Sequence, residues 1–313
     1  MMHRCAHKAI SGSRPQVRGF TLVEVVVAIV LTGIVVGFAV MFMTAPMHTY
    51  FSQARRAELT DSADAITRQV NDDLRRALPN SVRIRNAGTR AIVEMLRVEE
   101  IAFYRGTGQG ANVDQELNLS APDQKFHALG QFFPGSARPV TYNTLHICVG
   151  NTGVPGTVVT SRDAYQMRNV MTGNANITLA NSGIAGEDLV TLAVPFQFAA
   201  PPPTSTANRM FLVSGPVSYI CNSAANVRTL RRYEGYPVTA AIPASEAAAQ
   251  LNVGAAVNTV VANGLTSCRF SCQVTGAGVC SGDVVFEMTV ARTTNTVTDS
   301  LPVLIQAPVE NMP

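Results

Sequence analysis

The longest feature of the hydrophobic pattern is an apolar run from Phe20 to Ala45, in which Glu24 is the only charged side chain. As a helix, these 26 residues would extend about 39 Å at 1.5 Å per residue. That length exceeds the roughly 30 Å hydrocarbon core of a bilayer. Residues 20–45 are therefore predicted to form the transmembrane half of an N-terminal helix.

After Pro46 the apolar positions recur at steps of three and four, which is the period of one face of a helix. They are Leu59, Ala63, Ile66, Val70, Leu74 and Leu78, with charged residues between them. Pro79 ends the pattern, because the residue before a proline is pushed out of the helical region. The sequence predicts an amphipathic half of the same helix over residues 46–79, bent or loosened near Pro46.

Beyond Pro79 the pattern changes to period two, and turn residues separate the apolar runs. Predicted strands are Ser81–Arg85, Ala91–Arg97, Leu145–Val149, Thr157–Thr160, Asp188–Ala193, Arg209–Val213, Val217–Cys221, Val227–Tyr233, Cys268–Val274, Asp283–Ala291 and Ser300–Ala307. Strands that follow one another without intervening helices favour antiparallel pairing. The expected fold class is α+β: a long N-terminal helix packed on a mainly antiparallel sheet domain, residues 80–313.

Few other elements are expected in this domain. Ala244–Leu251 is the one candidate for a second helix, with Ser245 as its N-cap. The polar and Gly/Pro-rich stretches Gly106–Asn143 and Ala199–Asn208 are predicted to be loops. Within the second, Pro201–Pro203 would be a stiff connector.

Charge gives the helix a direction. Residues 1–19 contain Arg4, Lys8, Arg14 and Arg18 and no acidic residue, so this leader is expected to stay in the cytoplasm. Without it, 20 basic and 21 acidic residues remain, a net charge of −1 instead of the +3 of the whole chain. The sequence therefore indicates no nucleic-acid partner.

Glu24 is the most informative residue, because a carboxylate at bilayer depth costs about 2.5–3.5 kcal/mol even on translocon scales. It lies four residues after a Gly19-Phe20 junction that precedes the apolar run, whereas a secretory signal peptide is cut after its apolar region. The string from Gly19 to Glu24 resembles the class III signal of type IV prepilins and of the pseudopilins of type II secretion. An ordinary signal anchor with a stray glutamate is the alternative.

The resemblance implies roles for individual residues. A prepilin peptidase would cut between Gly19 and Phe20 and methylate the new amine of Phe20. The Glu24 carboxylate would pair with the N-terminal amine of a neighbouring subunit during assembly. Gly33 and Gly37 form a G-x-x-x-G pair that lets helix backbones approach closely; they would pack against other pilin helices, unless they reflect only the general frequency of glycine in membrane helices.

The cysteines suggest disulfides. Cys5 lies in the leader, and the five that remain would face an oxidising periplasm. Cys272 and Cys280 flank a glycine-rich hairpin and are the first expected bridge. Cys148 and Cys221, each at the end of an apolar strand, are the second, which leaves Cys268 over. Zinc is the alternative for the cluster over residues 268–280, but four closely spaced ligands and a nearby histidine are missing.

Catalytic signals are weak, so no enzyme, cofactor or metal is predicted. Three histidines, His48, His127 and His146, follow the leader. His48 would lie at the membrane surface, and His146 is interpreted as a core residue of a strand. The sequence contains neither G-x-S-x-G nor H-E-x-x-H. Glu187, Asp188 and Asp283 could contact calcium, but without a spaced loop they are interpreted as solubilising residues.

Longer strings in the soluble part resemble the MSHA-pilus biogenesis proteins of the MshO type. They are Leu74–Arg83, Gly215–Cys221, Leu230–Tyr236 and Val309–Pro313. The resemblance implies a minor pilin or pseudopilin, with J-type pseudopilins of type II secretion and W-type minor pilins as alternatives. Expected partners are prepilin peptidase, other major and minor pilins, the inner-membrane assembly platform and membrane lipid.

The expected location is the bacterial inner membrane, with a single span, a cytoplasmic N-terminus and a periplasmic C-terminal domain, and the pilus after assembly. A membrane-anchored periplasmic enzyme or binding module is the alternative class. It would require a catalytic constellation after residue 79, and the sequence offers none.

Overall fold

The computed structural model describes residues 19–173, 176–200, 208–274, 279–294 and 297–309. The chain divides into two compact units, Met1–Ala54 and Arg55–Pro313. Helix α1, Leu22–Arg75, contributes to both. It is continuous through Pro46 and ends three residues before the predicted Leu78. The leader up to Arg18, Pro201–Pro203 and the tail from Glu310 lie outside the described residues.

The domain half of α1, from Arg55 to Arg75, buries the stripe that its periodicity predicts. Leu59, Ala63, Ile66, Val70 and Leu74 are all buried, while the charged residues between them are mostly exposed. Fully burying a large aliphatic side chain contributes about 1.5–3 kcal/mol. This stripe, and not helix propensity alone, therefore holds the domain half of α1 to the sheets.

The strands pair antiparallel in two sheets. They are β1 (Arg83–Ala87), β2 (Arg90–Tyr104), β3 (Asp123–Leu129), β4 (Val140–Tyr142), β5 (His146–Cys148), β6 (Ile177–Asn181), β7 (Glu187–Phe196), β8 (Arg209–Asn222), β9 (Thr229–Glu234), β10 (Val257–Asn263), β11 (Leu265–Val274), β12 (Cys280–Thr294) and β13 (Val297–Val309). The large sheet has the order β10-β9-β8-β2-β3-β7-β6-β4, with β1 on β2 and β5 on β8; the small sheet has the order β11-β12-β13.

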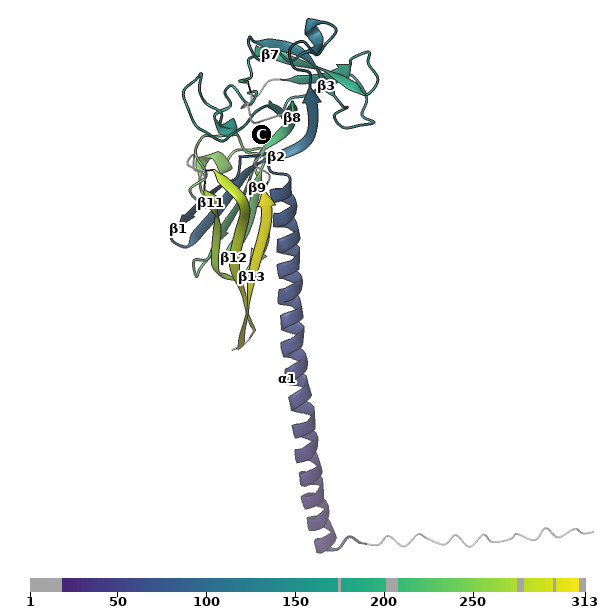
Figure 1. Ribbon diagram of the computed structural model, residues 1–313. Helices are drawn as coiled ribbons and strands as arrows, with labels where there is room; N and C mark the ends of the chain where they lie inside the picture. Colours follow the sequence, from purple (N-terminus) through teal and green to yellow (C-terminus); the bar gives the residue numbers. More distant parts are fainter. Residues whose placement is uncertain (1–18, 174–175, 201–207, 275–278, 295–296, 310–313) are drawn as a thin grey trace, which may run out of the picture. The chain divides into compact units, whose positions relative to one another are not determined.

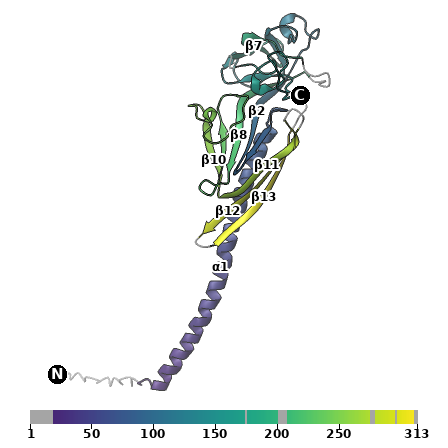
Figure 2. The same ribbon diagram turned by 90° about the vertical axis from the view of Figure 1, so that its left-hand side faces the viewer.

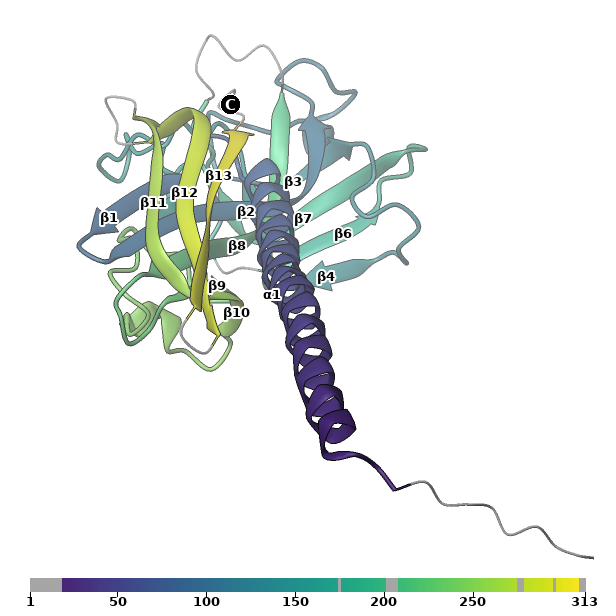
Figure 3. The same cartoon turned by 90° about the horizontal axis from the view of Figure 1, so that it is seen from below.

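Two principal cores lie against the large sheet. The first joins the α1 stripe to alternate residues of β2 and β8 and to the inner face of the small sheet, which includes the stacked rings of Phe270 and Phe286. The second joins β3, β5, β6 and β7 around Phe126 and Phe198. Figure 1 shows the small sheet beside the domain half of α1, with β13 the nearest strand, and Figure 3 shows β3, β4, β6 and β7 on the other side of the domain.

Strand β2 is buried on both faces, which explains its unbroken apolar sequence. Val93 and Met95 face the core under α1, whereas Ile92 packs into a separate cluster with Ile220 and Tyr233. A strand covered on both sides reads as a continuous apolar run and not as an alternating one. The large sheet therefore forms the middle layer of this part of the domain.

Several expected elements differ from the structure. The two predicted strands over residues 209–221 are one strand, β8, because Gly215 and Pro216 stay paired with Arg97 and Leu96 of β2 and the register shifts only beyond Gly215. The Gly106–Asn143 stretch is not a simple loop, since it contains β3 and β4. Strands β6 and β10 were not predicted, because short uncharged runs without long periodicity carry little signal.

Two further predictions were wrong. Thr157–Thr160 forms a turn with no strand pairing and with exposed valines. Ala244–Leu251 is not an α-helix, because only Ala249–Leu251 makes a single 3₁₀ turn, and its N-cap residue is Ala248 and not Ser245. An alanine-rich segment of eight residues is too short to be stable as a helix by itself, so packing decides its backbone.

Candidate processing and assembly segment

The N-terminus of α1 is capped by Thr21. Its side-chain oxygen accepts the backbone N–H of Glu24 at 3.3 Å, and its carbonyl accepts the N–H of Val25 at 3.2 Å. Thr21-x-x-Glu24 is the sequence of a capping box, which satisfies helix donors that would otherwise lack partners. The cap therefore places Glu24 in the first turn of α1, where the positive end of the helix dipole favours a negative charge.

The Gly19–Phe20 bond lies outside the helix. Both residues have non-helical backbone, both are exposed, and Phe20 exposes 76% of its surface. A peptide bond inside a helix has its N–H and C=O groups occupied, whereas this one precedes the cap residue. The bond is thus exposed and lies outside the hydrogen-bonded part of the helix.

The Glu24 carboxylate is free for another molecule. Its side chain is exposed, and among the described residues it has no hydrogen-bond or ion-pair partner. Gly33 and Gly37 are also exposed, and a Cβ added at either position would meet nothing. Glycine inside a helix is less stable than alanine by about 0.5–1 kcal/mol. No contact within the described chain requires a glycine at either position.

The helix that carries these residues is apolar enough to cross a membrane. Leu22–Phe42 has a mean hydropathy of 2.9, and none of this window is buried by the rest of the described chain. An apolar surface of this size requires either lipid or other helices as a cover. One N-terminal helix of this kind is compatible with a single-pass anchor.

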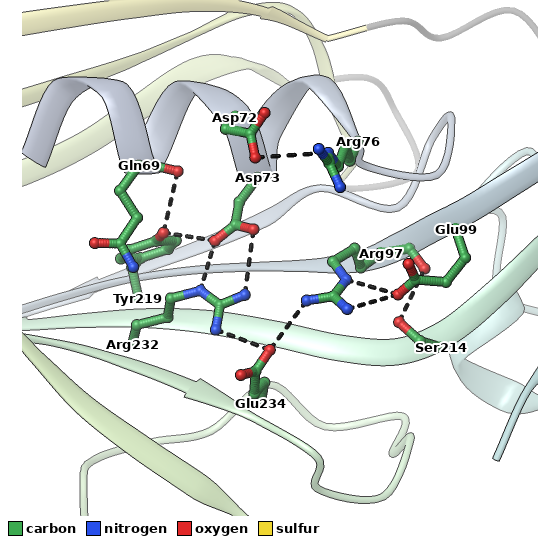
Figure 4. A network of polar contacts seen from close by, with 10 residues as sticks. All are labelled: Gln69, Asp72, Asp73, Arg76, Arg97, Glu99, Ser214, Tyr219, Arg232 and Glu234. Atoms are coloured by element: carbon green, nitrogen blue, oxygen red, sulfur yellow. Dashed lines mark hydrogen bonds and ion pairs between the residues drawn. The ribbon is translucent and has the colours of Figure 1, made fainter.

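At its other end, α1 is joined to the large sheet through Asp73, which is not among the functional residues predicted from the sequence. Its carboxylate accepts the hydroxyl of Tyr219 at 2.6 Å and Nε of Arg232 at 2.6 Å (Figure 4). Arg232 also pairs with Glu234 at 2.8 Å, and Glu234 pairs with Arg97 at 3.0 Å. A polar network therefore links α1 to β8, β9 and β2.

The electrostatics of this network follow from its burial. Burial raises the pKa of the Tyr219 hydroxyl, and the neighbouring Asp73 carboxylate raises it further. Burial alone would lower the pKa of Arg232, but its bonds to Asp73 and Glu234 outweigh that effect and raise it. The sequence does hold a signal for Asp73, since it lies between Val70 and Leu74 on the buried side of the helix, where a charge needs a partner.

The disulfides are Cys272–Cys280 and Cys221–Cys268. The first is the pair that the sequence favours. The second corrects the expected Cys148–Cys221 bridge, because β11 brings Cys268 over β8 while Cys148 lies buried as a free thiol on β5. Burial raises the pKa of that thiol, so it is an unreactive core residue. All three cysteines considered for zinc are therefore in disulfides.

The carboxylates considered for calcium have protein partners. Glu187 pairs with Arg105 at 2.6 Å and with His127 at 3.0 Å, and Asp188 pairs with Arg138 at 2.8 Å. Asp283 accepts a bond from Gln306. Among the described residues no cluster of three or more His, Cys, Asp or Glu is placed to hold a metal ion.

The two histidines whose side chains the structure describes, His127 and His146, are both buried in the large sheet. His146 is buried on β5, where its Nδ1 lies 2.8 Å from the carbonyl of Thr172, so it is the core residue that its apolar surroundings indicate. His127 is buried on β3 beside Glu187. The side chain of His48 lies outside the described ones.

Comparison with known proteins identifies the segment itself. Residues 14–40 match the family described as the prokaryotic N-terminal methylation motif. This chain carries a prepilin-type signal. The match includes Gly19, Phe20, Glu24, Gly33 and Gly37, and it supports a pilin-type protein that is processed by prepilin peptidase. No curated protein and no solved structure matches the chain.

Proposed function

We propose that this chain is a minor pilin or pseudopilin that enters or primes a filament of the MSHA-pilus type. The observation that carries the proposal is the combination of the methylation motif with an accessible Gly19–Phe20 bond and an unpaired Glu24 in the first turn of α1. J-type pseudopilins of type II secretion and W-type minor pilins share this mechanism and are the alternatives.

The mechanism follows from charge at the end of a helix. Cleavage after Gly19 would leave a positive amine on Phe20, next to the positive end of the α1 dipole. The positive N-terminus of one subunit would attract a carboxylate of a neighbouring subunit. Glu24 can supply that carboxylate, because it lies on a helix segment that nothing else in the described chain covers. In a low-dielectric helix bundle an unpaired charge is strongly penalised, so the Glu24–amine pair would set the register of each new subunit.

The soluble domain supports a low-copy position. It extends from Arg55 to Pro313 and contains two principal cores, which is large for the repeating unit of a filament. Strings such as Leu230–Tyr236, which form β9 and the turn after it, carry the resemblance to the MSHA system. The inner membrane, with the domain in the periplasm, is the proposed starting location.

The N-terminal residue of the chain isolated from membranes tests the proposal, with and without the host's prepilin peptidase. N-methylated Phe20 that depends on the peptidase is the expected result. An intact Met1 or Met2, or a cut after the apolar run, would remove the pilin function and favour a membrane-anchored enzyme or binding module. Deletion of neighbouring MSHA genes, with loss of the chain from sheared filaments, would select this system over its alternatives.

A further inference from the structure

The outer edge of β10 is a strand edge that the described domain leaves without a neighbouring strand. Strand β10 ends the large sheet and pairs only with β9 (Figure 2). Its sequence, Val257–Asn263, contains no charged residue and no proline, and its first four residues are exposed. Val257 and Val260 expose 54% and 42% of their surfaces.

The other terminal edges carry features that prevent strand addition. At the opposite end of the large sheet, β4 has three residues. In the small sheet, β13 contains Pro302 and Pro308, which cannot donate to a neighbouring strand. Natural proteins protect free edges by short strands, prolines, charges or covering groups.

The edge of β11 is covered by a side chain. Asn86 of β1 donates to the carbonyl of Phe270 at 2.7 Å and accepts the N–H of the same residue at 3.3 Å. The Cys221–Cys268 disulfide also ties this strand to β8. Within the described domain, the terminal edges of β4, β13 and β11 are therefore short, interrupted or covered, in contrast to that of β10.

The chemistry of the β10 edge determines what can bind it. Its backbone N–H and C=O groups point in alternation to β9 and to the open side, and no described residue bonds the groups on that open side. An extended strand can replace water along the whole of such a row of donors and acceptors. A bulge at Val261 follows, so the flat part of the edge is Val257–Val260.

We infer that Val257–Val260 accepts an extended, uncharged strand from a neighbouring pilin-like subunit, an inference that rests on the proposed function. The absence of charge on β10 disfavours a strongly acidic or basic partner segment, because this strand offers it no opposite charge to pair with. Val257 and Val260 lie on opposite faces of the strand, so the partner strand would contact one valine on each face.

A photo-crosslinking experiment on the full chain in its host tests this inference. p-Benzoylphenylalanine is placed at Val257, and in a matched chain at Leu304, which is 65% exposed on the proline-containing β13. We expect an adduct to a second pilin-like subunit from position 257, with the crosslinked peptide in a strand-forming segment, and none from position 304. Val260→Lys should abolish the adduct, while Leu304→Lys should leave it unchanged.

The outcomes separate the two proposals. If the chain begins at methylated Phe20 but position 257 gives no adduct, equal adducts at both positions, or an adduct to a stalk helix, the edge inference alone is overturned. An adduct that survives Val260→Lys also overturns it. An unprocessed chain overturns the proposed function and, with it, the inference that depends on a filament neighbour.

Discussion

At the scale of single residues, Glu24 and Asp73 show what one carboxylate does in two environments. Glu24 is exposed, in the first turn of α1, and has no partner among the described residues. Asp73 is buried at the other end of the same helix and has two partners within 2.6 Å. The first is available to another molecule, and the second is committed to the fold.

Substitution of Glu24 tests the first role. Glu24→Ala should leave the chain processed and inserted in the membrane but absent from filaments, because the amine of the next subunit loses its counter-charge. Glu24→Asp retains the charge with a shorter reach and is the matched control, with partial incorporation. The measurement is an immunoblot of sheared filaments against membranes, and normal incorporation of Glu24→Ala would argue against docking through this residue.

Asp73 and its neighbour Asp72 form a natural pair for the second role. Asp73→Ala should lower the free energy of unfolding by about 1–3 kcal/mol, because it removes the short acceptor of the Tyr219 hydroxyl and one of the two carboxylates paired with Arg232. Asp72 is exposed and only 3.5 Å from Arg76, so Asp72→Ala should cost under about 0.5 kcal/mol. Denaturant unfolding followed by near-ultraviolet tyrosine dichroism measures both, and equal losses would contradict the assignment.

His146 predicts how stability depends on pH. Burial lowers its pKa in the folded domain, and the bond to Thr172 only partly opposes that effect. A group whose pKa is lower in the folded than in the unfolded state stabilises the fold at pH values above its unfolded-state pKa. That contribution is lost as the pH falls through its folded-state pKa. The free energy of unfolding should therefore decrease below about pH 6.5.

A variant isolates this contribution. His146→Gln retains a donor for Thr172 and removes the titration, so the difference in unfolding free energy between pH 7.5 and pH 5 should be smaller than in the unsubstituted chain. The same denaturant titration at the two pH values measures it. An unchanged pH dependence would show that other groups cause the loss.

At the scale of elements, two disulfides hold the small sheet in place. Cys221–Cys268 connects β8 to β11 across 47 residues, whereas Cys272–Cys280 closes a hairpin across eight. In the chain-entropy view, the longer loop gives the larger stabilisation. The inter-sheet bridge should therefore matter more than the hairpin bridge.

Paired serine variants test this order. Replacing Cys221 and Cys268 should lower the unfolding free energy by about 4 kcal/mol, and replacing Cys272 and Cys280 by about 2.5 kcal/mol. Cys148 is a buried free cysteine and is unchanged in both variants, so it does not contribute to the difference between them. A larger loss from the hairpin pair would mean that local strand geometry, and not loop closure, dominates.

At the scale of the whole molecule, the boundary between the two units falls at Arg55, inside α1. The domain unit therefore includes the helix residues Leu59, Ile66, Val70 and Leu74, which belong to its first core. Removing them would expose the inner faces of β2, β8 and the small sheet. The domain half of α1 is thus part of the globular domain.

Two truncations test this boundary. A chain of residues 55–313, secreted to an oxidising compartment, should be soluble, oxidised and cooperatively folded. A chain of residues 80–313 lacks the buried stripe and should aggregate or unfold. Circular dichroism and gel filtration of both proteins make the measurement, and a well-folded 80–313 fragment would contradict the view that α1 completes the core.

Sequence alone determined the features that repeat locally. The apolar run, the three-and-four stripe from Leu59 to Leu74 and the capping string Thr21–Glu24 each depend on neighbours along one helix, and periodicity reports such neighbours directly. The processing signal was identified for the same reason, since a peptidase site is a short linear string. Most of the long strands were also predicted, because β2 and β8 contain long apolar runs and β12 has a central run of β-branched and aromatic residues.

Only the tertiary structure decided what meets across the chain. Cys221 pairs with Cys268 and not with Cys148, Asp73 meets Tyr219 and Arg232, and β10 is left at an open edge. Each of these depends on strand order and register, which bring together residues far apart in sequence. A linear pattern specifies which face of an element is apolar, but the partner of that face is chosen by packing the whole core.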